Sequence, residues 1–332
     1  MNKIAVLTSG GDAPGMNPAI RAVVRRALYS DVEVVGVKRG YYGLINSDFI
    51  EMDRGSVADI IHRGGTILLS ARCDEFKETE GKQKALENMK REGIDGLIVI
   101  GGDGTLRGAQ EINEELFIPT IGIPGTIDND LGGTEYTIGF DSAMNTILDA
   151  VNNIRDTATS HERTFVVETM GRDKGSLTLM SGLAGGADSI LIPEIKFDID
   201  KVCEKIEEGY AKGKLHSIVF VAEGIDDDFR TNRDLNQSKA FALGEVIKEK
   251  TDMDVRVIIL GHLQRGGRPS AKDRIVASQM GAKAVELLLD GEKNKMVSYK
   301  ENKITTCSID EAVNGEIEID KDMYDLAYIL SL

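Results

Sequence analysis

Short apolar runs rich in valine and isoleucine alternate along this chain with longer segments of helical periodicity. The runs at residues 97–100 and 120–123 are short and β-branched, which is typical of buried strands. Residues 105–116, which lie between them, have the length and the apolar period of a crossover helix. Repeated alternation of this kind predicts an α/β fold in which helices flank mostly parallel sheets.

The same pattern places strands and helices along the whole chain. We expect strands within residues 3–7, 33–37, 97–100, 120–123, 163–172, 189–192, 216–224 and 255–267. We expect helices at 56–61, 77–91, 105–116, 139–157, 175–183, 199–210, 243–250, 271–289 and 321–330. Another helix should begin near Asn17, because asparagine is a good N-cap and Pro18 suits the first helical position. Residues 38–48, 226–237 and the tail from 290 are expected to be loops or irregular.

The length of 332 residues exceeds what one small core needs and suits two lobes. We expect one lobe to comprise residues 1–138 and about 264–305, and the other to comprise residues 139–263 and a tail from about 306 to 332. Each lobe would be a Rossmann-like three-layer arrangement of a mostly parallel sheet between helices. The active site would lie in the cleft between them.

Glycine loops follow the strands at 97–100 and 120–123, and both loops contain aspartate. Because the carboxyl ends of parallel strands meet at one edge of a sheet, the loop at 101–104 and the loop around Gly125 should face the same crevice. Asp103, Asp128 and Asp130 would project there among exposed backbone N–H groups. Carboxylates beside a glycine cradle favour a metal-bound polyphosphate and a base, which are the working parts of phosphoryl transfer.

A third glycine loop, TSGGDAPGMN, joins the first strand to the first helix. Such a junction can bind phosphate through backbone donors and the helix dipole. The run is neither GxxxxGK[ST] nor GxGxxG, so a simple tight turn remains an equal alternative. Arg21 and Arg25 share one face of the following helix, where they would either be solvated or bind an anion.

The second half of the chain carries arginines close to its predicted strands, namely Arg163, Arg172, Arg256 and Arg265, together with Glu223 and His262. Arginine forks hold phosphate in a bidentate manner, and a glutamate accepts hydrogen bonds from sugar hydroxyls. Any one of these residues is more often a surface residue or part of an internal ion pair. Several of them at strand ends favour a phosphorylated, hydroxyl-rich acceptor.

Charge and cysteine content exclude several classes of function. The formal net charge of −15, from 40 basic and 55 acidic residues, disfavours nucleic acids and anionic membranes as partners. The sequence has no apolar run of about eighteen residues and no signal-peptide layout after Met1. Cys73, Cys203 and Cys307 form no CxxC pair, and the histidines have no metal-ligand spacing. A cytoplasmic location is therefore expected.

Taken together, the motifs resemble those of the phosphofructokinase type A family, the bacterial ATP-dependent 6-phosphofructokinases. The resemblance covers nearly the whole chain and includes, in order, TSGGDAPGMN, RGGT with SAR, GGDGT, PGTIDND, YTIGF, RDTATSHER, ETMGR, AKGK, and LGHLQRGG with DRI. GGDGT alone is shared with NAD kinases and lipid kinases, whereas PGTIDND, MGR and GHLQRGG in sequence are specific. The resemblance implies phosphorylation of fructose 6-phosphate at its 1-hydroxyl by ATP with Mg²⁺, the committed step of glycolysis.

The resemblance also implies roles for individual residues. Asp128 would take the proton of the 1-hydroxyl, and Arg72 with Mg²⁺ held by Asp103 would offset charge on the transferring group. The implied catalytic residues are Asp128, Arg72, Thr126 and Arg172. The implied ATP contacts are Gly11, Arg72, Cys73, Gly102, Asp103, Gly104 and Thr105. The implied sugar-phosphate contacts are Thr126, Ile127, Asp128, Arg163, Met170, Gly171, Arg172, Glu223, Arg256, His262, Leu263, Gln264 and Arg265.

Members of this family are typically homotetramers, and the resemblance implies that Arg163 and Arg256 complete the site of a neighbouring subunit. It also implies an effector site between subunits for small phosphorylated molecules of the ADP or phosphoenolpyruvate type. The implied effector residues are Arg21, Arg25, Arg54, Asp59, Arg155, Gly186, Ala187, Asp188, Lys212, Lys214, Leu215 and His216. Gly55 stands where relatives often carry a tyrosine, and Cys73 replaces a common aromatic residue, so activation by a nucleotide stays an open question.

Two glycines favour ATP over pyrophosphate as the donor. Pyrophosphate-dependent relatives resemble GGDD and PKTID, whereas this chain has Gly104 and Gly125, which leave room for the α-phosphate and the nucleoside. The alternatives are a pyrophosphate-dependent phosphofructokinase, a kinase acting on NAD or a lipid, and a non-catalytic phosphometabolite sensor of the same fold. A pure sensor has no need of a base such as Asp128. The lack of a dinucleotide glycine fingerprint argues against an oxidoreductase.

Overall fold

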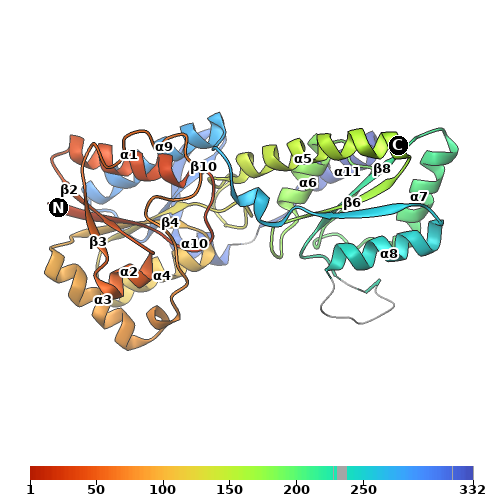
Figure 1. Ribbon diagram of the computed structural model, residues 1–332. Coiled ribbons are helices and arrows are strands. Elements are labelled where there is room, and N and C mark those ends of the chain that lie inside the picture. The colour runs from red at the N-terminus through yellow and green to blue at the C-terminus, as the bar shows by residue number, and fades with distance from the viewer. Residues whose placement is uncertain (227, 230–237, 316, 332) are drawn as a thin grey trace. The chain divides into compact units, whose positions relative to one another are not determined.

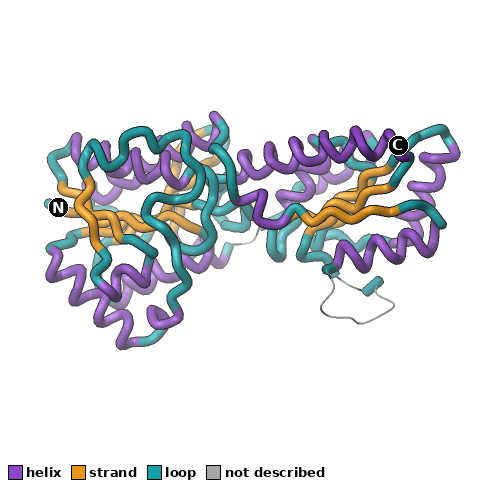
Figure 2. The backbone as a smooth tube through the Cα atoms, viewed as in Figure 1, coloured by secondary structure: helices purple, strands orange, loops and turns teal. Residues whose placement is uncertain are grey.

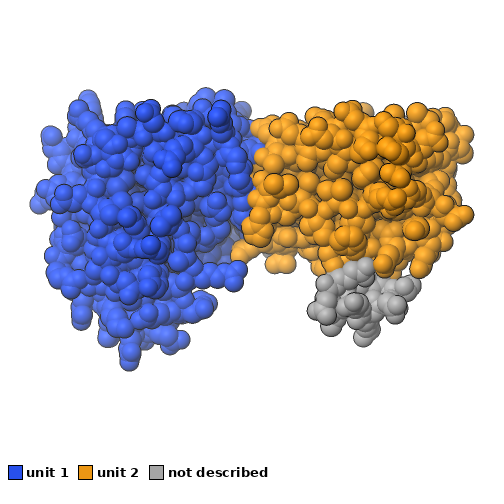
Figure 3. All heavy atoms as spheres, in the orientation of Figure 1, with its two compact units in different colours: residues 1–142, 265–317 blue, residues 143–264, 318–332 orange. Residues whose placement is uncertain are grey.

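The computed structural model describes residues 1–226, 228–229, 238–315 and 317–331. The chain divides into two compact units, shown in Figure 3: Met1–Ser142 with Arg265–Ile317, and Ala143–Gln264 with Glu318–Leu332. Each unit has its own sheet with helices on both faces (Figures 1 and 2). The predicted α/β class with mostly parallel sheets is confirmed.

In the part of the chain that the structure describes, the sheet of unit 1 has seven strands in the order β11-β10-β5-β4-β1-β2-β3. They are β1 (Lys3–Thr8), β2 (Glu33–Val37), β3 (Phe49–Met52), β4 (Gly96–Gly101), β5 (Thr120–Pro124), β10 (Lys295–Lys300) and β11 (Lys303–Ser308). Only the edge pairs β2–β3 and β10–β11 are antiparallel. The central strands β4 and β5 are buried along their whole length, as their continuous apolar sequences require.

Helices cover both faces of this sheet. On one face, α1 (Met16–Tyr29) packs against α9 (Ala271–Leu289), as Figure 1 shows. On the other face lie α2 (Tyr41–Asn46), α3 (Thr79–Glu92), α4 (Asp103–Glu115) and α10 (Ile309–Asn314), with the 3-10 helix η1 (Asp74–Lys77) before α3. Leu106, Ala109 and Ile112 repeat at helical spacing on α4 and are fully buried in the core of this layer.

The chain order changes direction at β1, which lies between β4 and β2. Open parallel sheets bind ligands at such a switch point, outside the carboxyl ends of the strands. The Ser9 N–H donates to the Ile100 carbonyl over 3.1 Å, and the Gly125 N–H donates to the Gly101 carbonyl over 2.9 Å. The loops after β1, β4 and β5 therefore lie side by side, which confirms the prediction that the glycine loops share one edge.

Among the described residues, the sheet of unit 2 has four parallel strands in the order β7-β8-β6-β9. They are β6 (Thr164–Thr169), β7 (Ser189–Leu191), β8 (Ser217–Ala222) and β9 (Val255–Ile259), and the 3-10 helix η2 (Gly261–Arg265) follows β9. In Figure 1, α5 (Phe140–His161), α6 (Ser176–Ala184) and α11 (Lys321–Leu330) cover one face. Helices α7 (Ile199–Ala211) and α8 (Lys239–Thr251) cover the other.

The predicted N-cap of the first helix is wrong. Helix α1 begins at Met16, and Gly15 is its N-cap with φ 115°, where a side chain would meet Ile138. Asn17 is buried, and its Nδ2 donates to the carbonyl oxygens of Arg63 and Gly64 over 3.1 Å each. Its side chain therefore anchors a distant loop, a tertiary role that outweighs the local preference of asparagine for a cap.

Three further expectations about local structure are wrong. Residues 38–48 contain α2, residues 56–61 form turns rather than a helix, and the tail from 290 contains β10, β11 and α10. Because β11 pairs with β10 at the sheet edge, residues 306–317 belong to unit 1 and not to the second lobe as expected. Of the predicted polar loop at 226–237, residues 227 and 230–237 lie outside the described part of the chain.

Two further findings concern membrane-spanning helices and disulfide bonds. None of the helices in the described residues is long and apolar enough to cross a membrane. Cys73, Cys203 and Cys307 all carry free thiols.

Candidate active site

The loop after β4 leads directly into the N-terminus of α4. A Cβ at Gly101 would lie 2.3 Å from Thr105 Oγ1 and 2.6 Å from the Ser9 carbonyl oxygen, so only glycine allows this close approach. In contrast, no atom lies within 4 Å of a Cβ built at Gly104, in the first turn of α4. The backbone N–H groups at this helix N-terminus and the open space beside Gly104 make it a suitable site for an anion.

Asp103 is the first residue of α4, and its side chain is 34% exposed. Its carboxylate lies 3.0 Å from Nε of Arg107, which also donates to the Val313 carbonyl of α10 over 2.8 Å. No cluster of three histidine, cysteine or acidic residues that could hold a metal occurs in the described ranges. A single accessible carboxylate fits Mg²⁺, which typically uses one or two carboxylates plus phosphate oxygens and water.

Asp128 lies in the loop after β5, and its side chain is only 4% exposed. Its backbone N–H donates to Oγ1 of the buried Thr126 over 3.2 Å, which fixes the turn of the loop. Nη2 of Arg265 lies 3.8 Å from Asp128 Oδ2, and Nη1 donates to the Asp12 carbonyl over 3.4 Å. The loop thus presents a nearly buried carboxylate beside a guanidinium group.

Gly11 leaves the space that the Arg265 guanidinium occupies. A Cβ at Gly11 would lie 2.5 Å from Arg265 Nη1. The sequence placed Gly11 among the ATP contacts and Arg265 among the sugar-phosphate contacts, and the structure brings the two residues together. The loops after β1 and β5 therefore meet at one arginine side chain.

The carboxylate of Asp273 ties the start of α9 to the segment that follows the Asp128 loop. It is fully buried and accepts from the Tyr136 hydroxyl over 2.6 Å, the Gly139 N–H over 2.8 Å, and both the N–H and the hydroxyl of Ser142 over 2.9 and 2.6 Å. Burial raises the pKa of Asp273, and the hydrogen bonds from Ser142 and Tyr136 counteract this effect. Four donors on one carboxylate make it a structural anchor.

The anchored segment in turn supports the candidate base. The Ile138 N–H donates to the Pro124 carbonyl over 2.9 Å, and the Thr137 hydroxyl donates to the Thr126 carbonyl over 2.6 Å. These bonds clamp both sides of Gly125 and hold the backbone two residues before Asp128. Helix α9 also follows Arg265 closely in the chain. The Asp273 carboxylate therefore anchors both the segment that supports Asp128 and the segment that carries Arg265.

In unit 2, the turn after β6 is organised by Glu223, which follows β8. Its Oε1 accepts from the N–H groups of Gly171 over 3.2 Å and Arg172 over 2.7 Å. The buried Gln264 accepts from the Met170 N–H over 3.1 Å. Arg172 has φ 53°, a left-handed conformation that is uncommon for a residue with a side chain. Part of the predicted sugar-phosphate set is thus brought together, because Glu223 and Gln264 bind the backbone of Met170, Gly171 and Arg172.

Arg163 and Arg256 do not join this set. Nε of Arg163 donates to Asp254 Oδ2 over 2.6 Å, and Nη1 of Arg256 donates to Asp254 Oδ1 over 2.5 Å. Both arginines stand where β6 and β9 begin, whereas Arg172 and Glu223 follow the ends of β6 and β8. The six residues of β6 span about 20 Å, so one group lies at the amino ends of the parallel strands and the other lies at their carboxyl ends. Of the arginines that the sequence placed close to strands, Arg172 thus lies just after the end of its strand, whereas Arg163 and Arg256 lie where their strands begin.

The remaining predicted active-site residues differ in exposure. Arg72 is exposed, while Cys73 is partly buried against the core and burial raises the pKa of its thiol. Ile127 is fully buried, so only its backbone is available to a ligand. In η2, Leu263 is 69% exposed and His262 is exposed as well.

The predicted effector residues of unit 2 form a connected cluster. Arg155 donates to the carbonyl oxygens of Gly185 and Gly186 and lies 3.4 Å from Nε2 of His216. Lys214 pairs with Asp188, whose other oxygen accepts from the Ile218 N–H over 2.7 Å. Burial lowers the pKa of His216, and the charges of Arg155 and Lys214 lower it further. Lys212 pairs with Glu208, and Leu215 is exposed.

The predicted effector residues of unit 1 lie on α1 and the turns after β3. Arg25, Arg54 and Asp59 are exposed, and Arg21 is half-buried. Burial and the nearby charge of Arg25 lower the pKa of Arg21. The penalty on Arg21 would be relieved by an anion bound beside the two arginines.

Known proteins similar to this chain identify its family. A family model described as phosphofructokinase matches residues 3–288. This chain belongs to the phosphofructokinase family. It is 68% identical to the ATP-dependent 6-phosphofructokinase of Halothermothrix orenii and 52% identical to that of Oceanobacillus iheyensis, in each case over 332 residues and the full length of both chains. The phosphofructokinase structure from Saccharomyces cerevisiae superposes with a TM-score of 0.86 at 37% identity, over 99% of this chain and 47% of that one.

Sequence reasoning missed three residues that organise this phosphofructokinase site: Asp273, Tyr136 and Asp254. The motifs YTIGF and DRI contain the first two, and their partnership appears only in the fold. The aspartate at the start of DRI was a detectable signal, because a carboxylate in the first turn of a long predicted helix can accept hydrogen bonds from nearby donors. Asp254 had no sequence signal beyond its place next to a strand.

Proposed function

We propose that this protein transfers the γ-phosphoryl group of ATP to the 1-hydroxyl of fructose 6-phosphate, giving fructose 1,6-bisphosphate and ADP. One observation carries the proposal: the adjacent loops after β4 and β5 hold an accessible Asp103 at a helix N-terminus and a nearly buried Asp128 beside Arg265. Phosphoryl transfer needs these parts, a phosphate cradle, a carboxylate for a metal and a base for the attacking hydroxyl. Full-length relatives named ATP-dependent 6-phosphofructokinase support it.

Asp128 acts as the general base in this proposal. The 1-hydroxyl must lose its proton as it attacks, and a carboxylate within hydrogen-bond reach can accept that proton. Burial keeps water from competing for the carboxylate, and Thr126 fixes the loop that aims it. Arg265 places positive charge beside the acceptor, and Arg72 and Arg172 are proposed to offset charge on the transferring group.

Asp103 is proposed to hold Mg²⁺ together with the phosphates of ATP. The bound ion would supply charge neutralisation on the β- and γ-phosphate oxygens. Asp103 can turn toward such a ligand and give up its ion pair with Arg107. The guanidinium of Arg107 would then still donate to the Val313 carbonyl, so it would keep a partner. At the N-terminus of α4, where Gly102 is the N-cap, the backbone N–H groups of Asp103 and Gly104 are the proposed donors for the phosphate chain. The Thr105 N–H donates to the Gly102 carbonyl over 3.0 Å, so Thr105 would contribute through its side chain.

Gly104 supports ATP as the donor rather than pyrophosphate. No atom lies within 4 Å of its missing Cβ, so the space that a larger residue would fill is open to the nucleotide. Gly125 supports the choice less directly, because a Cβ there would lie 3.1 Å from Ile100 and the residue also serves packing. Turnover with ATP and none with pyrophosphate is the expected result.

We further propose that active sites are shared between subunits of a homotetramer. Arg163 and Arg256 lie at the sheet edge opposite Arg172 and Glu223, so they cannot reach the same sugar phosphate within one unit. Asp254 holds both arginines in place, so the pair is preorganised to bind a sugar phosphate in the active site of a neighbouring subunit. Phosphorylated effectors of the ADP or phosphoenolpyruvate type would bind the predicted effector residues. We also propose that the protein acts in the cytoplasm, and its free thiols support this location.

A coupled assay of ADP release with fructose 6-phosphate tests the function. We expect turnover with ATP in the native protein and a loss of several orders of magnitude in Asp128→Ser, with ATP binding retained. Near-native turnover in the variant would overturn the base assignment, and turnover with pyrophosphate alone would overturn the donor.

Mixing two inactive variants tests the sharing of sites. Asp128→Ser and Arg256→Ser, unfolded and refolded together, should regain part of the activity that neither shows alone, because some mixed sites carry both native residues. Activity that never exceeds that of the separate variants would contradict shared sites.

A further inference from the structure

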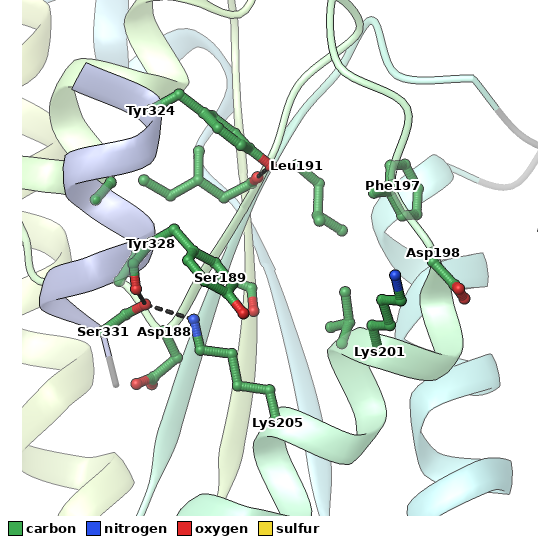
Figure 4. Close-up of a pocket in the computed structure, with 14 residues that line it drawn as sticks. Asp188, Ser189, Leu191, Phe197, Asp198, Lys201, Lys205, Tyr324, Tyr328 and Ser331 are labelled. Carbon is green, nitrogen blue, oxygen red and sulfur yellow. Dashed lines mark hydrogen bonds between the residues drawn. The ribbon is translucent and has the colours of Figure 1, made fainter. Parts of the chain in front are cut away.

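A small, partly open cavity lies in unit 2 under the C-terminal helix, and its lining includes none of the residues discussed as catalytic. Its volume is about 150 Å³, and its walls come from β7, α7 and α11. Figure 4 shows Tyr324 and Tyr328 of α11 on one side, and Phe197 with Lys201 on the other. Most of the wall is apolar, with Leu191 at the back.

Lys205 of α7 places an ammonium group in this cavity, and the side chain of Lys201 also lines it. In Figure 4 the side chain of Lys205 reaches across to Ser331, to whose hydroxyl it donates a hydrogen bond. Its ammonium also lies 4.4 Å from the ring centroid of Tyr328. Among the described residues, no carboxylate lies within ion-pair distance of this ammonium, and burial lowers the pKa of Lys205.

The acidic residues of the cavity wall are engaged elsewhere. Asp188 pairs with Lys214 and accepts from the Ile218 N–H. Asp198 caps α7 by accepting from the Asp200 N–H over 3.0 Å. A half-buried cation against an apolar wall is costly unless a negative charge joins it.

We propose that this cavity binds a small monocarboxylate with a compact apolar body, whose carboxylate is held by Lys205 and Ser331 and whose body packs between Tyr324 and Leu191. The charge follows from the cation that lacks an acidic partner in the described chain. The size follows from the volume, since an apolar cavity of roughly 150 Å³ holds one benzene-sized molecule. The apolar walls favour a ring or branched chain over a bare inorganic anion, which would lose its hydration without gaining contacts.

The cavity also borders the segment that carries predicted effector residues, so a bound ligand would contact that segment. Ala187 and Asp188 line the cavity, and they continue directly from Gly186 in the segment that carries predicted effector contacts. An occupant therefore packs against the back of that segment, and none of the residues that line the cavity belongs to the loops that hold Asp103 or Asp128.

Calorimetric titration of the full-length protein with benzoate tests the site. Benzoate should bind and saturate, while benzamide, which has the same shape without the charge, should bind at least about tenfold more weakly. Lys205→Met keeps most of the side-chain volume and removes the charge, so it should reduce benzoate affinity by a similar factor and leave basal turnover unchanged. Lys250→Met, on an exposed lysine that pairs with Asp200, is the matched control and should bind benzoate normally.

Thermal melting separates this role from a purely structural one. Replacing an unpaired half-buried charge by an apolar side chain should leave the melting temperature of Lys205→Met equal or raised, and benzoate should no longer raise it further. Ala327→Leu should fill the cavity and block binding with the charge intact. Equal affinity for benzamide, displacement of benzoate by inorganic phosphate, undiminished binding in Lys205→Met, or no binding of benzoate at all would each overturn the proposal.

Discussion

The guanidinium of Arg265 lies 3.8 Å from the carboxylate of Asp128, and the missing side chain of Gly11 makes room for it. Three loops of unit 1 thus converge on one pair of opposite charges. The absence of a side chain at position 11 therefore leaves room for the guanidinium of Arg265. This contact links two residues, Gly11 and Arg265, that the sequence alone had assigned to different substrates.

Gly11→Ala should disturb the sugar-phosphate side of the site. The new Cβ would meet the mobile end of Arg265, so the protein should fold with a nearly unchanged melting temperature while the guanidinium moves away from Asp128. We expect KM for fructose 6-phosphate to rise by about tenfold, in steady-state assays at saturating ATP. The double variant with Arg265→Gln should be little worse than Arg265→Gln alone, because both changes remove the same contact. Additive effects, or a rise in KM for ATP only, would point to a direct role of Gly11 with the nucleotide.

Asp273→Asn should destabilise the protein and weaken catalysis together. The amide cannot accept from all four donors that the carboxylate satisfies, so at least one buried donor loses its partner. We expect a loss of about 2–4 kcal/mol in the free energy of unfolding, measured by urea denaturation. The kcat of the folded fraction should also fall, since the Asp128 loop loses its anchor. Ser142→Ala, which removes one donor and keeps the carboxylate, should have a clearly smaller effect on both quantities.

Gly104→Asp should lower the affinity for ATP without unfolding α4. The position is open, and an acidic residue is favourable in the first turn of a helix. The new carboxylate would occupy space and repel phosphate, so KM for ATP should rise by about a hundredfold or more. Gly104→Asn has the same size without the charge and should be intermediate. Unchanged ATP kinetics in both variants would remove Gly104 from the donor site.

Acid should destabilise the effector cluster through His216. Burial and the charges of Arg155 and Lys214 hold the pKa of His216 below the ordinary value of about 6.5. Protonation is therefore less favourable in the folded protein, and the stability from the neutral imidazole is present above pH 6.5 and declines as the pH falls below that value. The drop in melting temperature between pH 7.5 and 5.5 should be smaller in His216→Gln than in the native protein. His161→Gln, an exposed control, should keep the native drop.

Arg25→Ala should blunt the response to phosphorylated effectors. The exposed Arg25 and the half-buried Arg21 repel each other, and a bound phosphate would relieve this repulsion. We expect turnover without effector to stay close to native, while the half-maximal concentration of ADP or phosphoenolpyruvate rises by about tenfold. An unchanged effector response would count against the site.

The order of elements around the candidate site was predictable because it depends on short-range patterns. The apolar runs of β4 and β5 and the period of α4 are local properties of the chain, and parallel pairing follows from the helix between them. The loops carrying Asp103 and Asp128 were therefore correctly expected at one edge of the sheet. Glycines at the strand ends marked the places where backbones approach closely.

Other features were not predictable from local pattern, because distant residues compete for the same groups. Asn17 has the chemistry of an N-cap, yet its bonds to Arg63 and Gly64 decide its place. The tail from 290 lacks strong periodicity, but β10 extends the sheet beside β5 and gives β11 a partner. Pairing with an existing sheet edge stabilises strands that would be marginal alone.

The sequence by itself determined the fold class, the family motifs and the loops that carry the candidate chemistry, because each depends on residues close together in the chain. Only the tertiary structure decided which charges meet. It joined Arg265 to Asp128, gathered four donors on Asp273, and placed Arg163 and Arg256 on Asp254 at the sheet edge opposite Arg172. Such pairings depend on strand order and direction, which set distances between residues that the sequence keeps far apart.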